Sequence, residues 1–203
     1  MSKRKLFEIG GVIAGVILVA FGVAALVMGF NGRSTVVDNL KQEQIYFGDA
    51  ANDPTVPAKY SGQLVDNGDK ARAFATMMRG HALESTNGLT YAQMGRFLAA
   101  NGKGDDGQGG TNDPAAAATD PKTGQPVSNP ARNIWVTETA LSTALNTAYM
   151  AERLSLFGIV VGIALLLSGI GFLVLAVGGA LRYAEKTAPV GRTAPPVTPI
   201  PTT

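Results

Sequence analysis

The chain has 203 residues, no cysteine and one histidine, and its formal net charge is +2. Because cysteine is missing, disulfides, thiolate catalysis, zinc–thiolate sites and iron–sulfur clusters are excluded. Residues 33–153 carry eleven Lys and Arg against thirteen Asp and Glu, so this segment has no basic face, and we expect no nucleic-acid partner.

The first predicted element is a transmembrane helix over residues 9–32, a run without charge between Glu8 and Arg33. About 20 apolar residues in a helix cross the roughly 30 Å of hydrocarbon in a bilayer. A cleaved signal peptide is the alternative, because residues 3–5 are basic. We favour a retained span, since the run exceeds the roughly 7–15 residues of a signal sequence and no cleavage motif follows it. Residues 1–8 would then be a short cytoplasmic N-terminus.

Residues 33–153 are predicted to form an extracytoplasmic helical domain. Residues 34–45 keep helical spacing, so the first helix either continues outward or resumes there. Residues 46–67 contain two prolines and several glycines, which predicts irregular chain.

A second helix is predicted over Gly68–Glu84, where apolar residues recur at helical spacing. Asp66 or Asn67 can cap its first turn. Asn87 and Gly88 predict its end, because both tolerate the left-handed conformation found at helix C-termini.

A third helix is predicted to begin at Thr90, because Thr90 and Gln93 have the T-x-x-Q spacing of a capping box. Tyr91 is expected to fold back onto Phe74 and Met78. The stretch is therefore interpreted as a structural corner between two helices, made by His81, Gly88, Thr90, Tyr91 and Gln93.

Residues 101–129 follow this predicted helix and are rich in Gly, Asp and Pro. They contain almost no apolar side chain to offset the entropy of ordering, so we expect a disordered insertion.

The last helix is predicted to start at Pro130 and to run without a break into a second span, residues 154–181. Trp135 is interpreted as a packing residue on the stalk outside the membrane. The tail, residues 182–203, is rich in proline and is expected to be cytoplasmic and extended. Its P-V-T-P sequence could dock into an aromatic groove, although disorder without a partner is favoured.

Lys and Arg near the span ends predict the orientation. Three basic residues precede the first span, and Arg182, Lys186 and Arg192 follow the second. Only Arg33 and Arg153 border the spans on the other side, and Lys41 lies a little further out. Both termini are therefore expected in the cytoplasm, with the chain crossing the plasma membrane twice.

Small residues recur along one face of each span, at spacings of four, seven and seven. Such faces let two helix backbones approach closely in lipid. We favour packing of the two spans on each other within one chain, and a docking face for another subunit is the alternative. The residues are Gly11, Gly15, Gly22 and Gly29 in the first span and Gly158, Gly162, Gly169 and Ala176 in the second.

His81 is the one imidazole available for chemistry. A metal shared with Glu84 is possible, but non-haem iron uses two histidines and a carboxylate, and catalytic zinc usually takes three protein ligands. A Ser/His/Asp arrangement has no G-x-S-x-G motif to support it. We interpret His81 as a residue near a helix C-terminus, where its cationic form is favoured, and we expect no cofactor.

Two stretches of the sequence, in YFGDAANDPTVPAKYSGQLVDNGDKARAFA and MRGHALESTNGLTYAQM, resemble a family of small actinobacterial two-span membrane proteins. The shared positions are Tyr60, Gly62, Gln63, His81, Leu83, Gly88, Thr90, Tyr91 and Ala92. Such proteins often carry the label aromatic ring-opening dioxygenase. Because that chemistry needs more iron ligands than this chain has, the resemblance implies topology and lineage rather than activity.

The predicted fold is an all-α membrane protein. Two transmembrane helices form an antiparallel hairpin that extends outward as a stalk and carries a small helical cap. Neither span contains an ionisable residue, which argues against a transport pathway. We expect a non-enzymatic accessory or scaffold subunit of a respiratory or cell-envelope complex, in contact with lipid and with other membrane subunits or copies of itself.

Two other functions stay open at this point. The first is a module that binds a small molecule or lipid in an apolar pocket near Phe47, Tyr60, Phe74 and Tyr91. The second is a metal-dependent enzyme using His81 and Glu84.

Overall fold

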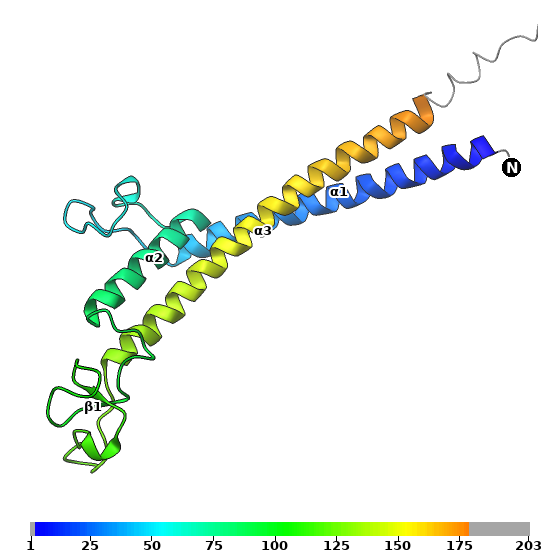
Figure 1. Ribbon diagram of the computed structural model, residues 1–203. Coiled ribbons are helices and arrows are strands. Elements are labelled where there is room, and N and C mark those ends of the chain that lie inside the picture. The colour runs from blue at the N-terminus through cyan, green and yellow to red at the C-terminus, as the bar shows by residue number, and fades with distance from the viewer. Residues whose placement is uncertain (1–2, 179–203) are drawn as a thin grey trace, which may run out of the picture. The chain divides into compact units, whose positions relative to one another are not determined.

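The computed structural model describes residues 3–178, and over this range the protein is mostly helical (Figure 1). Its α-helices within this range are α1 (Lys3–Gln42), α2 (Gly68–Ser85) and α3 (Ala131–Gly178). The connections contain two short 3-10 helices, η1 (Ala58–Tyr60) and η2 (Pro114–Ala116), and two strands, β1 (Phe97–Leu98) and β2 (Gly110–Thr111). The predicted tail 182–203 and the last residues of the predicted second span lie outside the described residues.

The chain divides into two compact units. The apolar unit consists of Met1–Leu26 and Val160–Thr203, and the head unit is Val27–Ile159. α1 and α3 contribute to both units, whereas α2 and the strands belong to the head unit alone.

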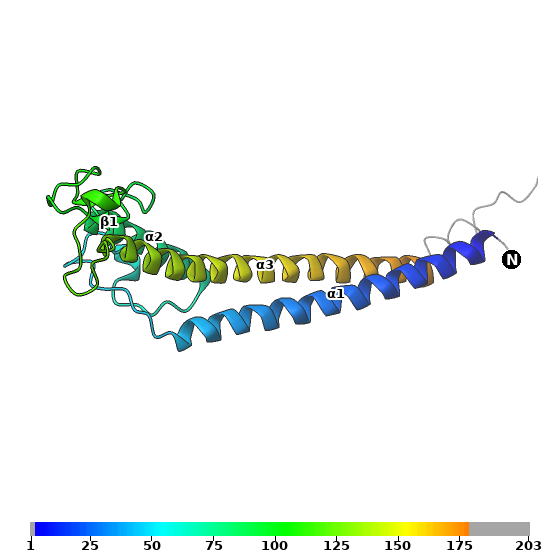
Figure 2. The same cartoon turned by 90° about the horizontal axis from the view of Figure 1, so that it is seen from below.

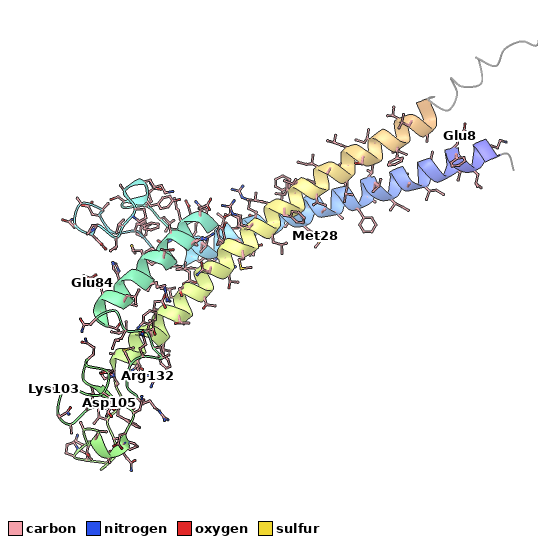
Figure 3. The ribbon with its side chains drawn as sticks, in the orientation of Figure 1. Glu8, Met28, Glu84, Lys103, Asp105 and Arg132 are labelled. Atoms are coloured by element: carbon pink, nitrogen blue, oxygen red, sulfur yellow. The ribbon has the colours of Figure 1, made fainter. Side chains whose placement is uncertain are left out.

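α1 and α3 are long and apolar enough to cross a membrane. The most apolar stretch of each has a mean hydropathy of 2.7 in α1 and 2.8 in α3, and only 11% and 17% of these stretches are buried inside the protein. The core helix of a soluble protein buries most of its apolar face, whereas here apolar side chains stand outward along both helices (Figure 3). Met28, for example, is 74% exposed. The prediction of two long apolar helices is confirmed.

α1 continues through Asn31 and Gly32 without interruption and ends at Gln42. Of the two possibilities that the sequence leaves open after the first run, the structure therefore has the continuous helix. α3 likewise runs from Ala131 to Gly178 in one piece, so it enters the second apolar run without a break, as predicted.

The head unit has an apolar core where the outer end of α1, the 45–65 segment, α2 and α3 meet. Phe47 is 3% exposed and packs on both Tyr60 and Phe74, at 5.3 Å between ring centroids in each pair. α2 lies beside the first half of α3 (Figures 1 and 2), and Leu145 of α3 joins the same core. The buried members are Leu40, Phe47, Val56, Val65, Ala71, Ala75, Met77 and Leu145.

α2 begins and ends as its sequence predicts. The side chain of Asn67 caps it by accepting the backbone N–H of Lys70 at 3.0 Å. At its end, Asn87 and Gly88 have φ values of 51° and 81°, and the N–H of Gly88 donates to the carbonyl of Leu83 at 2.7 Å. This is a left-handed C-terminal cap.

The prediction of a third helix from Thr90 is wrong. The side chain of Gln93 does accept the N–H of Thr90 at 2.8 Å, which is one half of a capping box. However, the chain makes a single turn and then enters β1, because Gly95 must approach the backbone of Thr111 closely. The head unit is therefore not purely helical.

The prediction of disorder over 101–129 is also wrong. β1 pairs antiparallel with β2, and Leu98 exchanges backbone hydrogen bonds with Ala118 and Val127. Hydrogen bonds to polar side chains order this segment in place of an apolar core, and Asp106 accepts three of them.

Asp106 accepts three backbone N–H groups, from Gly95, Gln108 and Gly110, each at 2.8 Å. Partial burial opposes ionisation of this carboxyl, but the three N–H donors outweigh it and hold the pKa of Asp106 below its ordinary value. Apolar burial alone does not predict such a loop, because a carboxylate orders it.

Candidate functional site at the base of the head unit

The small residues of the two apolar runs face each other within the apolar unit. A Cβ built on Gly22 would lie 2.9 Å from the carbonyl oxygen of Gly162, and one on Gly15 would lie 2.9 Å from the carbonyl oxygen of Gly169. A Cβ on Gly11 would lie 3.1 Å from the Cβ of Ala176. Backbone approaches backbone at Gly15 and Gly22, so side chains larger than hydrogen do not fit there, whereas Gly11 faces the side chain of Ala176.

The same pattern extends into the head unit. A Cβ on Gly29 would lie 2.9 Å from the carbonyl oxygen of Ser155, and one on Gly32 would lie 2.7 Å from the hydroxyl of Ser155. Gly158 is half-buried, and the residues opposite Gly29 are Ser155 and Ile159 rather than Gly158.

Charged residues gather where the two apolar runs end. We call this group the basal cluster; it contains Arg33 of α1, Asp69 and Arg72 of α2, and Tyr149, Glu152 and Arg153 of α3. All six belong to the head unit.

Glu152 joins the three helices. It is 7% exposed, and its carboxylate accepts the Nε–H of Arg33 at 3.1 Å and the backbone N–H of Gly68 at 2.5 Å. Gly68 is the first residue of α2, so Glu152 places a negative charge at the positive end of that helix. A Cβ on Gly68 would lie 2.9 Å from the Cα of Tyr149, which is why only glycine lets α2 start so close to α3.

Two further arginines surround Tyr149. Arg153 pairs with Asp69, and Arg72 donates to the hydroxyl of Tyr149 at 3.0 Å. The guanidinium carbons of Arg72 and Arg153 lie 4.9 and 5.1 Å from the centroid of the Tyr149 ring. The hydrogen bond from Arg72 and the neighbouring Arg153 lower the pKa of Tyr149, and the hydrogen bond to Asp69 raises the pKa of Arg153.

His81 lies on α2, one turn before its end, and binds the 53–55 segment. Its Nε2 is 3.0 Å from Asp53 and 2.7 Å from the hydroxyl of Thr55. Because that hydroxyl donates to Asp53 at 2.6 Å, the Nε2–H of His81 serves as donor to both. The hydrogen bonds from Thr55, and then the charge of His81, lower the pKa of Asp53.

These contacts give His81 a role in holding the loop to the helix. Glu84 is exposed on α2 (Figure 3). Within residues 3–178, no three His, Cys, Asp or Glu side chains are grouped so that they could hold a metal ion. The described residues thus supply no third ligand to the pair His81 and Glu84.

The four aromatic residues of the predicted pocket are not gathered around one groove, although Tyr60 is part of the lining of the open groove on α2. Phe47, Tyr60 and Phe74 pack on each other in the core of the head unit. Tyr91 is 45% exposed and lies against Arg132, 3.9 Å from ring centroid to guanidinium carbon, so it does not fold onto Phe74. Among the structural-corner residues, Gly88 ends α2 and Thr90 binds Gln93, but Tyr91 has another partner.

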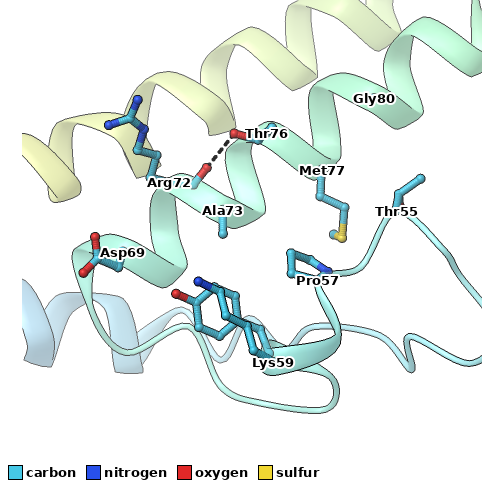
Figure 4. Close-up of a pocket in the computed structure, with 10 residues that line it drawn as sticks. Thr55, Pro57, Lys59, Asp69, Arg72, Ala73, Thr76, Met77 and Gly80 are labelled. Carbon is cyan, nitrogen blue, oxygen red and sulfur yellow. Dashed lines mark hydrogen bonds between the residues drawn. The ribbon is translucent and has the colours of Figure 1, made fainter.

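An open groove of about 670 Å³ instead runs along one face of α2 (Figure 4). Its floor contains Ala73, Met77 and Gly80, and Pro57 and Lys59 form the opposite wall. The groove is shallow and mixed in polarity, without the enclosed apolar lining of a typical small-molecule pocket.

Trp135 is a packing residue, as predicted. It is 3% exposed, and its Nε1–H donates to the carbonyl of Leu89 at 2.9 Å. It thereby joins the start of α3 to the chain that follows α2.

Sequence reasoning missed the basal cluster. In the sequence, Arg33 and Arg153 stand out only as residues that border the apolar runs, and no local pattern distinguishes Glu152. Aligning the glycines of the two runs in opposite order would have brought Arg33 level with Glu152, so the signal was present. Comparison of the chain with known protein families, with curated proteins and with solved structures gave no match.

Proposed function

We propose that this chain is a non-enzymatic integral protein of the plasma membrane that acts as an accessory or scaffold subunit. Its spans, residues 9–32 and 154–181, form an antiparallel hairpin with both termini in the cytoplasm, and residues 33–153 form the extracytoplasmic cap. The proposed host is a respiratory or cell-envelope complex. The resemblance to actinobacterial two-span proteins is part of the same proposal.

The observation that carries this proposal is that both charge-free runs end at the same level. Gly32 is the last residue of the first run, and it lies against Ser155, the second residue of the second run. One residue further, Arg33 binds Glu152. A bilayer surface requires such coincident ends in a pair of spans, whereas a water-soluble helix pair has no reason to change polarity at one level.

The length of the glycine-lined contact supports the same conclusion. From Gly11 to Gly32, α1 rises about 31 Å at 1.5 Å per residue. The hydrocarbon core of a bilayer is about 30 Å thick. Gly11 meets Ala176 and Gly32 meets Ser155, so α3 contributes the same number of residues to this length.

The distribution of polar groups supports a role in binding rather than in chemistry. Ion and proton pathways need ionisable groups at membrane depth, and the sequence has none in either run. In the head unit, His81 holds a loop, Glu152 holds the start of α2, and Asp106 holds the loop around β2. The features that remain available for binding are the exposed apolar faces of the helices and the groove on α2.

The topology can be tested by labelling single cysteines, because the natural chain has none. Ser34→Cys and Thr119→Cys are expected to react with a membrane-impermeant maleimide in intact cells. Ser2→Cys and Thr203→Cys are expected to react only after the cells are lysed. Labelling of either terminus in intact cells would overturn the proposed orientation, and release of the chain by alkaline carbonate washing would overturn membrane insertion.

The accessory role can be tested by extraction in a mild detergent, followed by affinity purification and cross-linking mass spectrometry. We expect the tagged chain to bring down a constant set of membrane subunits or further copies of itself. Recovery of the chain only as an isolated monomer, with no reproducible cross-link to another protein, would contradict the proposal.

A further inference from the structure

We propose that Arg72 and Arg153, whose guanidiniums both contact the ring of Tyr149, bind the phosphate of an anionic phospholipid in the outer leaflet of the membrane. The acyl chains of that lipid would lie along the apolar surface of α3 that begins at Leu154. This inference rests on the proposed function, because it requires the second run to enter the bilayer at this residue.

The two arginines lie where the second apolar run begins. Tyr149 and Arg153 are the last polar turn of α3 before its charge-free run, and Arg72 reaches them from α2. Tyrosine is enriched at the level of lipid headgroups, because its ring is apolar and its hydroxyl is polar. The two guanidiniums that flank this ring therefore lie where lipid phosphates are found.

The basal cluster has more positive than negative side chains. The basal cluster contains three arginines and two carboxylates. Arg33 is paired with Glu152, and Arg153 with Asp69. Within the described residues, no carboxylate lies at ion-pair distance from Arg72, and its guanidinium contacts the ring and hydroxyl of Tyr149. One fixed, exposed guanidinium is thus left over, and its planar set of N–H donors fits two phosphate oxygens.

The surface next to these arginines is apolar and open. A shallow groove of about 720 Å³ follows α3, lined by Thr147, Tyr149, Met150, Ala151, Arg153 and Leu154. Its exposed lining is mostly apolar, and Met150 and Leu154 are 69% and 70% exposed. Phe157, one turn further into the run, is 64% exposed.

A cation beside an extended apolar surface fits a lipid better than a soluble anion. A free phosphate would use the guanidiniums and leave Met150, Leu154 and Phe157 without a partner. A phospholipid uses both, with its headgroup on the arginines and its chains on the apolar side chains. Each basic residue near an anionic lipid surface contributes about 1 kcal/mol, which corresponds to roughly fivefold in affinity.

The test uses the full-length chain in detergent, with lipid adducts counted by native mass spectrometry. The probes are a phosphatidylglycerol and a phosphatidylcholine of equal chain length. We expect the natural chain to retain phosphatidylglycerol preferentially. Arg72→Gln should lower that preference about fivefold, and Arg72→Gln with Arg153→Gln should lower it further. Arg72→Gln is the informative single variant, because Arg153 also pairs with Asp69.

The matched control is Arg79→Gln. Arg79 lies on the same helix, seven residues further along, and its guanidinium carbon is 5.1 Å from the centroid of the Trp135 ring. It has the same kind of aromatic contact but lies away from the span end, so its loss should leave lipid selectivity unchanged. Circular dichroism of each variant shows whether its helices are intact.

Three results would overturn the inference. These are equal retention of the two lipids by the natural chain, an Arg72→Gln variant that keeps the full preference, and displacement of phosphatidylglycerol by millimolar inorganic phosphate. The last result would indicate a site for soluble anions. If the chain resists carbonate extraction but shows any of these results, the lipid site fails while the proposed membrane protein stands.

Discussion

Substitution of Gly22 by alanine tests whether the two apolar helices pack as closely as the structure indicates. The added Cβ would lie 2.8 Å from the backbone nitrogen of Leu166, 2.9 Å from the carbonyl oxygen of Gly162 and 3.1 Å from the Cα of Leu166. All three are backbone atoms, so no side chain can rotate away to make room. The helices must therefore separate locally.

Ordinary contacts of a Cβ begin at 3.4 Å, so the local separation is about 0.6 Å, which forfeits roughly a quarter or more of the dispersion energy of neighbouring contacts. Overpacking of this kind costs about 1–3 kcal/mol. Alanine returns up to about 1 kcal/mol as a better helix former. We expect Gly22→Ala to destabilise the helix pair by about 1–2 kcal/mol.

The assay is a titration with sodium dodecyl sulfate in mixed micelles. Separation of the helices is followed by energy transfer between dyes on Leu6→Cys and Val177→Cys, both of which are exposed positions of the apolar unit. Gly10→Ala is the matched control, because a Cβ on Gly10 meets nothing within 4 Å. If Gly22→Ala proves as stable as Gly10→Ala, the close backbone contact does not exist and the reasoning is refuted.

Three further predictions concern the head unit. Glu152→Gln removes the negative charge that binds both Arg33 and the first N–H of α2. Since Arg33 is half exposed, we expect the free energy of unfolding to fall by about 1–2 kcal/mol, less than for a fully buried pair. Amide exchange in the first turn of α2 should become roughly tenfold faster, whereas the control Asp38→Asn should leave it unchanged. The pKa of Asp106 is lower in the folded chain than in the unfolded chain, so its contribution to stability is present above the ordinary Asp pKa of about 3.9 and is lost as the pH falls through the folded value. Amide protection at Gly95 and Gly110 should therefore fall in that acid range in the natural chain, and an equal acid loss in Asp106→Asn would contradict this. Trp135→Phe removes the indole N–H that donates to the carbonyl of Leu89, while the hydroxyl of Thr86 still donates to that carbonyl at 2.6 Å. We therefore expect a loss of about 0.5–1.5 kcal/mol of unfolding free energy, measured by thermal circular dichroism. Tyr91→Phe, at an exposed ring, should cost almost nothing, and equal losses in the two variants would argue against the Trp135 bond.

The helices were predictable because their signals are local. Asn67 and Gly88 define the ends of α2 through capping and φ preferences, which depend on a few neighbouring residues. The continuous apolar runs of α1 and α3 are long enough to cross a membrane, and this length can be read directly from the sequence. These elements could be placed without knowing any long-range contact.

The connections could not be predicted in the same way. Thr90 and Gln93 have the capping spacing and even form its hydrogen bond, yet the next turn is lost because β1 gains partners near Ala118 and Val127. Asp106 orders its loop through backbone N–H groups that lie up to 11 residues away. Hydropathy carries no information about such contacts, and the partner of Tyr91 was missed for the same reason.

The basal cluster was within reach of the sequence but required a pairing of the two runs. Arg33 and Glu152 are 119 residues apart, and no local pattern relates them. The glycine spacing does, once the runs are aligned in opposite order from Gly29 and Ser155. The pairing of charges in the basal cluster can therefore be predicted from the packing of the small residues, but not from the charged residues alone.

The contacts at Gly15 and Gly22 also limit how the apolar unit can move. Sliding α1 along α3 by one residue, about 1.5 Å, would drive a bulkier side chain against the opposite backbone, and a glycine returns to the same place only after four or seven residues, about 6 or 10 Å. Sliding of one helix along the other in small steps is therefore blocked, because the next position that fits lies a whole glycine spacing away. If a partner on one side of the membrane sends a signal through this protein, the two helices must tilt or turn together to carry it.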